Sequence, residues 1–340
     1  MSTLETNSIG KYSGNNVSID DALNLKSYTT AQRDALTSVA GDIIYNSDDN
    51  KPQIYNGSVW VDLGSTNFVL DFLIVAGGGG GGSQTATVTN GGGGGAGGLQ
   101  STITNTGGGG SLLPQQTILT GTSYTVTVGA GGAVDTNGNN SVFNTTTSIG
   151  GGSGGGVSAA DAGGSGGSGG GGSAAGGGGS GGTGTVNQGF SGSTGQTSGN
   201  YIGGGGGGAG EAGGTDGAGY GGDGVSVAIT GSSVDYAGGG GGGGNVGNFG
   251  QGGSGGGGRG GTNSVNSAVA GSANKGGGGG GSANNTDAAA AGGSGVVILR
   301  YLNTFSISVG AGLSWSGTEG TDGSYKYATI TAGTGTVSFN

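Results

Sequence analysis

The chain has 340 residues, of which 101 are glycine, roughly four times the average usage of about 7%. It contains no histidine and no cysteine, only two prolines, and 8 basic against 18 acidic residues, which gives a net charge of -10. This composition excludes a collagen helix, a disulfide framework, the usual zinc site and an imidazole or thiol catalyst.

Charge and hydropathy narrow the possible partners. An acidic chain with so few lysines and arginines is not expected to bind nucleic acid. The longest apolar run, residues 68–76, is interrupted by Asp71 and is far shorter than the roughly 18 residues that a membrane span needs. Residues 1–5 lack the basic and apolar segments of a secretory signal. We therefore expect neither membrane insertion nor secretion.

Residues 1–66 have the pattern of a small folding unit. Thr29 and Gln32 have the spacing of a capping box, which predicts a short helix through Val39 that stops at Gly41. Strands are predicted at 42–46, 53–55 and 58–63, and Asn56-Gly57 predicts a type I′ turn between the last two. Such a helix and three-stranded meander buries little apolar area, so we expect it to depend on a partner chain.

Glycine is concentrated in the middle of the chain. Residues 1–76 hold five of the 101 glycines and residues 296–340 hold seven, which leaves 89 between Gly77 and Gly295. Apolar, β-rich runs predict strands at 68–76, 123–129 and 295–301 that frame this region. The predicted organisation is an N-terminal module at 1–66, a glycine-rich domain at 67–302 and a C-terminal β cap at 303–340.

Two structures fit the glycine runs. One is a flexible linker, the usual state of Gly/Ser tracts. The other is a set of extended threefold helices packed side by side, whose outward N–H and C=O groups bond to one another because no Cβ intervenes. Turn residues and isolated apolar side chains interrupt the runs at semi-regular intervals, and residues 52–258 contain no lysine or arginine. A linker has little use for such interruptions and usually stays soluble through charge, so we favour the packed lattice.

Several segments resemble proteins of tailed bacteriophages. Residues 28–36 (YTTAQRDAL), 41–47 (GDIIYNS) and 55–60 (YNGSVW) resemble a module of tail-fibre and other virion proteins. Residues 73–76 (LIVA) with the following glycines, 124–132 (YTVTVGAGG) and 293–301 (GSGVVILRY) look like the glycine-rich domain of such proteins. The lattice is similar to the polyglycine II sandwich of receptor-binding tail adhesins in T-even-like phages, although this chain carries its own N-terminal module.

The resemblance implies a fold that is mainly β with a packed polyglycine II helix lattice. It also implies a non-enzymatic fibre or adhesin of the virion, assembled in the host cytoplasm. The N-terminal module would bind other virion proteins of the tail or capsid and form a homotrimer. The loops would contact a host-surface glycan or protein. Because aromatic rings stack on sugars and fill interface pockets, the candidate receptor contacts are Phe190, Tyr201, Tyr220, Tyr236 and Phe249.

Other interpretations remain open. Each of these rings could instead cap the lattice or seal a subunit interface. The whole chain could be a capsid fibre or tail decoration without receptor binding, and an ice-binding coat is disfavoured because the loops are irregular. Residues 221–224 (GGDG) resemble one unit of a calcium-binding repeat, but the unit is not repeated. We therefore expect no metal, no cofactor and no catalytic residue.

Overall fold

A computed structural model of the chain describes residues 24–64, 66–84, 90–156, 161–199, 201–245, 247–263, 266–283 and 287–340. The chain forms two compact units, Met1–Thr66 and Asn67–Asn340. Residues 1–23 of the predicted N-terminal module lie outside the described residues, as do residues 85–89 between the first two glycine runs. Among the residues that are described, no helix is both long and apolar enough to cross a bilayer.

The first unit is a short helix on a four-stranded sheet. Thr29 Oγ1 accepts from the N–H of Gln32 at 3.3 Å, and Gln32 Oε1 accepts from the N–H of Thr29 at 3.0 Å, so the predicted capping box is confirmed. The helix ends earlier than predicted. The elements in chain order are β1 (Ser27–Tyr28), α1 (Thr30–Asp34), β2 (Ile43–Asn46), β3 (Lys51–Tyr55) and β4 (Trp60–Asp62). The fourth strand arises because β1 pairs in parallel with β2.

The turn between β3 and β4 is longer than the predicted two-residue type I′ turn. Tyr55 pairs with Trp60, so four residues connect the strands, and of Asn56 and Gly57 only Gly57 has positive φ, at 101°. The Asn56 side chain accepts from the N–H groups of Ser58 and Val59, at 2.9 Å each. This local bonding stabilises the longer loop in place of the tight turn.

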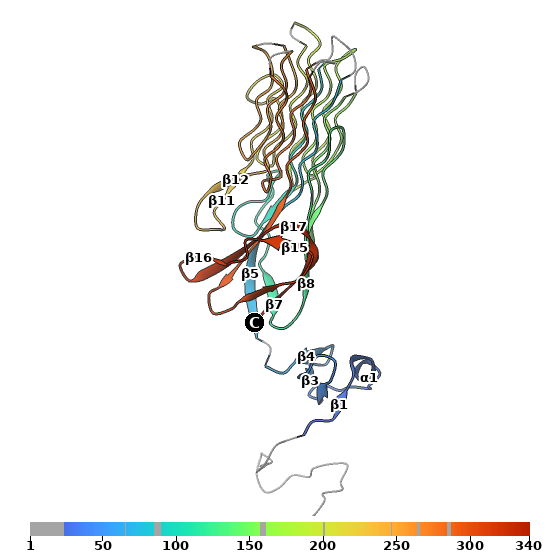
Figure 1. The fold of residues 1–340 in the computed structure, drawn as a ribbon, viewed down its shortest axis with the longest axis vertical. Helices are drawn as coiled ribbons and strands as arrows, with labels where there is room; N and C mark the ends of the chain where they lie inside the picture. Colours follow the sequence, from blue (N-terminus) through green and yellow to red (C-terminus); the bar gives the residue numbers. More distant parts are fainter. Residues whose placement is uncertain are drawn as a thin grey trace, which may run out of the picture. The chain divides into compact units, whose positions relative to one another are not determined.

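The second unit is built on an 11-stranded sheet whose main path runs β10-β9-β8-β17-β13-β5-β6. Figure 1 labels β5, β8 and β17 of this path. The three predicted framing strands are confirmed as β5 (Asn67–Val75), β8 (Tyr124–Val128) and β13 (Val296–Leu302). The path is completed by β6 (Leu99–Ser101), β9 (Ser141–Phe143), β10 (Thr146–Ser148) and β17 (Tyr325–Phe339). Off the path, β7 (Gln116–Leu119) pairs with β5, while β14 (Ile307–Val309), β15 (Leu313–Trp315) and β16 (Gly320–Asp322) pair with β17.

Residues 303–340 therefore form strands, as expected for a β cap, and the longest of them is also part of the main sheet. β17 lies between β13 and β8, and a separate hairpin is made by β11 (Val225–Val227) and β12 (Val234–Tyr236). The fold is mainly β, as predicted.

Both faces of the β5–β13 pair are buried. Leu70, Phe72 and Ile74 pack in a core on one face, and Leu73 and Val75 pack in a second core on the other. Sheets covered on both sides have strands that are apolar at almost every position rather than at alternate positions. This double burial explains why residues 72–76 are an unbroken apolar run.

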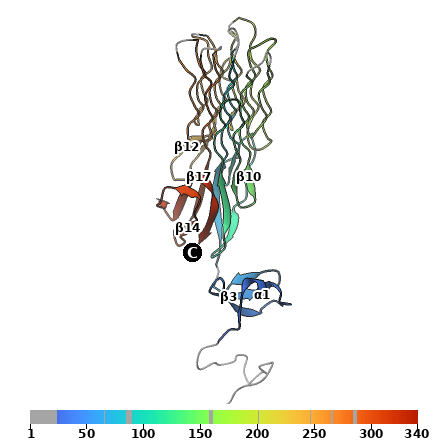
Figure 2. The same cartoon turned by 45° about the vertical axis from the view of Figure 1, so that its right-hand side comes forward.

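Beyond the sheet, the glycine runs form the predicted lattice of extended helices, seen as parallel wavy traces in Figures 1 and 2. Run 77–82 continues β5 and shows the pattern. Gly77, Gly78 and Gly79 donate to Asn139, Gly293 and Gly95, and the next three glycines donate to the same three segments, at Thr136, Ala290 and Gly92. The carbonyls of 77–82 accept in the same threefold order from residues 151, 132, 279, 154, 135 and 282.

Run 77–82 thus has six neighbouring segments, and each turn of three residues repeats the same partners. The bonds it donates are 2.9–3.0 Å long. Because each such bond contributes roughly 1 kcal/mol net, the lattice draws its stability from the backbone itself. The prediction of an ordered lattice rather than a flexible linker is confirmed.

Glycine is required in this lattice because neighbouring backbones touch. A Cβ added at any of residues 77–82 would lie 2.0–2.1 Å from a carbonyl oxygen of another run. No side chain fits such a gap, and the obstacle is backbone that is itself held by hydrogen bonds.

Serine side chains form hydrogen bonds to backbone groups at the boundary between the sheet and the lattice. Ser141 Oγ donates to the carbonyl of Val75 at 2.8 Å and accepts from the N–H of Gly129 at 2.9 Å. Ser148 Oγ donates to the carbonyl of Ile74 at 2.9 Å. Both serines are fully buried. They satisfy backbone groups at the level where strand pairing gives way to threefold packing.

Candidate functional site

The lattice has two ends with different neighbours. At the sheet end, Ala76 bonds to Gly98 and Leu99 to Gln188. At the other end, called here the lattice tip, the runs reverse direction in turns (Figure 1). Here Ala174 bonds to Asn90 and Gly203 bonds to Gly243. β5 enters the unit at the sheet end, so the lattice tip is the end remote from where the second unit begins.

Two of the predicted contact residues lie at the lattice tip. Tyr201 is 46% exposed, has φ 45° and accepts at its carbonyl from the Asn90 side chain. Phe249 is half-buried, and the guanidinium of Arg259 lies 5.9 Å from its ring centroid. Bridges between Asn90 and Ala283 and between Gly244 and Thr262 tie the surrounding turns together.

Of the other three predicted residues, two lie away from the lattice tip. Phe190 bonds through its N–H to Gly208 at the sheet end and is half-buried. Tyr236 is only 7% exposed and packs in the second core, where burial and then the nearby Tyr327 raise the pKa of its hydroxyl. Tyr220 is half-buried close to the lattice tip, because the preceding Gly219 lies against Ile202 and Gly203, and its carbonyl accepts from the N–H of Gly214. The five rings do not form one surface, and Tyr236 is a core residue, a role that neither the receptor-contact prediction nor its alternative gave it.

A groove at the sheet end was not predicted from the sequence. It has a volume of about 510 Å³ and is lined mainly by amide and hydroxyl side chains, with Phe72, Leu113 and Pro114 as its apolar part. Gln116 Nε2 donates to Thr146 Oγ1 at 3.0 Å, and Asn144 Nδ2 donates to Gln116 Oε1 at 3.2 Å. Because these polar groups already form hydrogen bonds with one another, part of the hydrogen-bonding capacity of the groove is used within the protein.

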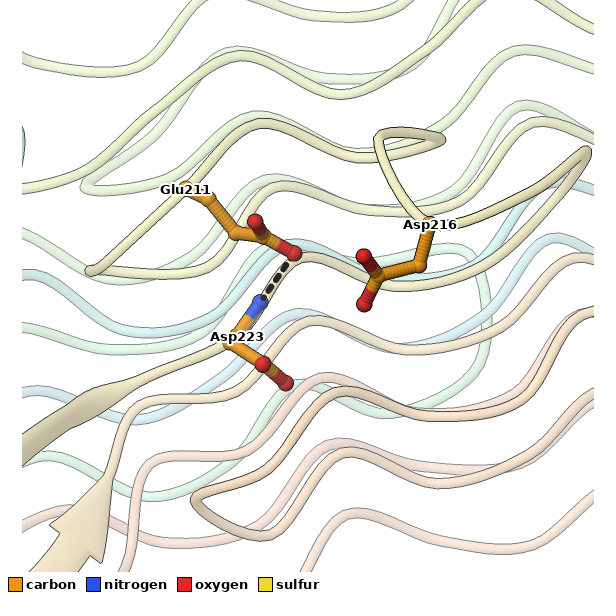
Figure 3. A group of neighbouring side chains, drawn as sticks. All are labelled: Glu211, Asp216 and Asp223. Carbon is orange, nitrogen blue, oxygen red and sulfur yellow. Dashed lines mark hydrogen bonds between the residues drawn. The ribbon is translucent and has the colours of Figure 1, made fainter.

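A cluster of three carboxylates lies on the flank of the lattice (Figure 3). Glu211, Asp216 and Asp223 each place an oxygen within 4.8 Å of the others. Glu211 Oε1 accepts from the N–H of Asp223 at 3.3 Å, and Asp223 Oδ1 accepts from the N–H of Ser254 at 2.6 Å. These oxygens are the ligand type that calcium prefers, but exposed acidic groups often gather without an ion. Of the three, sequence reasoning singled out only Asp223.

Comparison with known families agrees with this architecture. A family model described as a glycine-rich domain matches residues 56–302, from the β3–β4 turn to the end of β13. The chain belongs to this glycine-rich domain family. Among curated proteins and among solved structures, the comparisons found no match. The glycine-rich domain thus includes all three framing strands together with the whole lattice.

Proposed function

We propose that this glycine-rich domain protein is a non-enzymatic fibre or adhesin of a tailed-phage virion. The first unit would bind tail or capsid proteins, the lattice would act as a stiff spacer, and the lattice tip would contact a glycan or protein on the host surface. The observation that carries the proposal is the threefold bonding of run 77–82 to six segments. A body cross-linked in this way resists bending and holds its loops in place.

The position of the loops supports the same function. Recognition usually resides in loops presented by a rigid scaffold. β5 enters at the sheet end, so attachment through the first unit leaves the lattice tip as the free end of the glycine-rich domain. Tyr201 and Phe249 are the candidate contacts there, because an exposed or half-exposed ring offers apolar area at low entropic cost.

Competition for host adsorption tests the proposal. Purified protein should slow adsorption of the phage that carries it, and the double variant Tyr201→Asn/Phe249→Ser should lose most of this effect. Asparagine is chosen at residue 201 because it tolerates the positive φ of 45°. The control is Val186→Ser in the loop that follows run 179–184, because Val186 is 82% exposed and remote from the lattice tip.

Two outcomes would contradict the proposal. If the double variant competes as well as wild type does, Tyr201 and Phe249 at the lattice tip do not contact the receptor. Absence of any competition, together with antibody labelling along the side of the tail or on the capsid in electron micrographs, would favour a decoration protein instead.

A further inference from the structure

The groove at the sheet end is lined by side chains of one chemical kind. Seven of its ten lining residues have an amide or a hydroxyl group, and none of the ten is charged. Most of them come from two places, the segment 113–117 that leads into β7 and the turn 144–146 between β9 and β10, while Gln100 belongs to β6. The volume of about 510 Å³ lies within the range of about 300–1,000 Å³ that is typical of small-ligand sites.

Two glutamine side chains of the groove are each held at one end by a buried residue. Gln115 Nε2 donates to Asp71 Oδ1 at 2.9 Å, and Asp71 is only 6% exposed. Gln100 Oε1 accepts from the hydroxyl of the fully buried Ser148 at 3.4 Å. Among the described residues, no group donates to Gln115 Oε1 and none accepts from Gln100 Nε2. The groove therefore offers an oriented acceptor and an oriented donor that the protein itself does not use.

The turn between β9 and β10 contributes further unused groups. Asn144 Nδ2 donates to Gln116 Oε1 at 3.2 Å, and Gln116 is held in turn by its bond to Thr146 Oγ1. Within the described part of the chain, Asn144 Oδ1 and the hydroxyls of Thr145 and Thr117 have no hydrogen bond. Because a hydroxyl can donate and accept at once, the groove presents acceptors, a donor and groups that act as either.

We propose that this groove binds a neutral oligosaccharide. Each sugar hydroxyl both donates and accepts, so it can pair with the unused amide oxygens, the unused amide N–H groups and the threonine hydroxyls alike. The C–H face of a sugar ring is apolar and would lie against Leu113 and Pro114, since Phe72 is only 1% exposed. An anionic ligand would find no cationic side chain in the lining.

The proposed sugar site goes beyond the proposed function. It lies at the sheet end, whereas the candidate receptor contacts Tyr201 and Phe249 lie at the lattice tip. The binding is expected to be weak, because Gln115 and Asn144 are exposed and exchange their hydrogen bonds with water. We expect dissociation constants of about 1 mM for a single oligosaccharide.

A glycan array followed by a titration tests this inference. Fluorescently labelled full-length protein is applied to immobilised neutral hexose and N-acetylhexosamine oligosaccharides, next to uronic-acid and sulfated oligosaccharides. The buffer contains no glycerol or other polyol, because a polyol would compete for the groove. We expect signals on neutral oligosaccharides, and the strongest of these is then titrated against unlabelled protein by saturation-transfer NMR.

Two variants remove unused groups from opposite parts of the groove. Asn144→Gly/Thr145→Val removes the free amide oxygen and one hydroxyl, and glycine tolerates the φ of 53° at residue 144. Gln100→Glu replaces the unused amide nitrogen by an oxygen and keeps an acceptor for Ser148. We expect the double variant to bind about tenfold more weakly or worse and Gln100→Glu about fivefold more weakly, because each lost hydrogen bond costs a factor of about five.

The matched control is Asn274→Gly. Asn274 is also exposed, has a φ of 61° and makes a side-chain hydrogen bond, from Ser294 Oγ at 3.2 Å, but it does not line the groove. This variant should bind the oligosaccharide as wild type does. Thermal unfolding of every variant checks that the second unit remains folded.

Three results would overturn the inference. They are the absence of signals on neutral oligosaccharides, signals on acidic oligosaccharides alone, and wild-type binding by the folded groove variants. Binding that is lost in Tyr201→Asn/Phe249→Ser and kept in the groove variants would place the sugar at the lattice tip, which supports the proposed function only. Binding that is lost in the groove variants and kept in Tyr201→Asn/Phe249→Ser would support the sugar site independently of host adsorption.

Discussion

Arg300 of β13 lies opposite Asp71 of β5, with Arg300 Nη1 3.7 Å from Asp71 Oδ2. Asp71 is 6% exposed and also accepts from Thr102 Oγ1 at 3.0 Å and Gln115 Nε2 at 2.9 Å. The pair joins the strand that enters the glycine-rich segment to the strand that leaves it. An ion pair inside the sheet thus joins the two strands at the ends of the glycine-rich segment.

Arg300→Met is expected to destabilise the second unit by about 2–4 kcal/mol, because it leaves the buried Asp71 carboxylate without its counter-charge. Urea unfolding measures this loss. Trp315 of β15 reports on the second unit alone once Trp60 has been replaced by phenylalanine. Asp322→Asn, which weakens the more exposed partner of Arg300, should cost less than about 1 kcal/mol. Equal unfolding midpoints for Arg300→Met and wild type would contradict this prediction.

Gly93→Ala should prevent normal packing of the lattice. The new Cβ would lie 2.0 Å from the carbonyl oxygen of Gly240, so we expect a loss of about 3 kcal/mol or more. Gly177→Ala is the matched control, because its Cβ would meet nothing within 4 Å and should change stability by no more than about 0.5 kcal/mol. Thermal unfolding compares the two variants. Similar melting temperatures would contradict the prediction and show that the neighbouring backbones can move apart to admit a methyl group.

Ser141→Ala should cost about 2 kcal/mol, because it leaves the carbonyl of Val75 and the N–H of Gly129 without the serine hydroxyl in a buried place. Ser180→Ala, at an exposed serine, should have an effect within about 0.5 kcal/mol. Hydrogen exchange of the Gly129 amide gives a local measure. Unchanged protection of that amide in Ser141→Ala would count against the role assigned to the hydroxyl.

Glu319 should make stability fall at acid pH. Burial acts to raise the pKa of Glu319, but hydrogen bonds from the Tyr301 hydroxyl, the Ile307 N–H and the Lys326 ammonium outweigh it and hold the pKa below its ordinary value of 4.5. Burial, followed by the contact with Glu319, raises the pKa of Tyr301. A carboxylate with a lowered pKa contributes its stability above the ordinary pKa and loses it as the pH falls through the lowered one.

The measurement for Glu319 is the difference in melting temperature between wild type and Glu319→Gln. We expect wild type to be the more stable at pH 7 and the difference to shrink below about pH 4. A difference that stays constant from pH 7 to pH 3 would show that the charge of Glu319 does not matter.

Asp216→Asn should raise the melting temperature slightly, by about 1 °C at low ionic strength, because it relieves repulsion within the cluster of Glu211, Asp216 and Asp223. The gain should disappear at about 1 M salt, where such interactions are screened. If added calcium raises the melting temperature of wild type but not of Asp216→Asn, the prediction is contradicted and the cluster holds a cation.

Local structure was largely predictable from the sequence. The capping box at Thr29 and the strands that became β2, β5, β8 and β13 follow from side-chain patterns that act over a few residues. The turn at Asn56-Gly57 was misread because the Asn56 side chain bonds to two backbone N–H groups and stabilises a longer loop. The pairing of β17 between β8 and β13 depends on contacts between distant segments, which no local pattern encodes.

The candidate site was less predictable than the fold. All five aromatic residues lie between glycine runs, yet Tyr201 reaches the lattice tip while Tyr236 enters the core. Which end a loop occupies depends on the direction of the run before it. The groove near Gln116 and the carboxylates around Asp216 likewise gather residues from segments that are separate in sequence.

The sequence by itself favoured an ordered lattice for the long central segment, because glycine lets neighbouring backbones approach closely enough to bond to one another. Only the tertiary structure decided which run bonds to which. Identical glycines carry no side chain that could select a neighbour, so the partners of run 77–82 are chosen by the sheet from which it emerges and by the lengths of the turns between runs. The same choice places Tyr201 and Phe249 at the lattice tip.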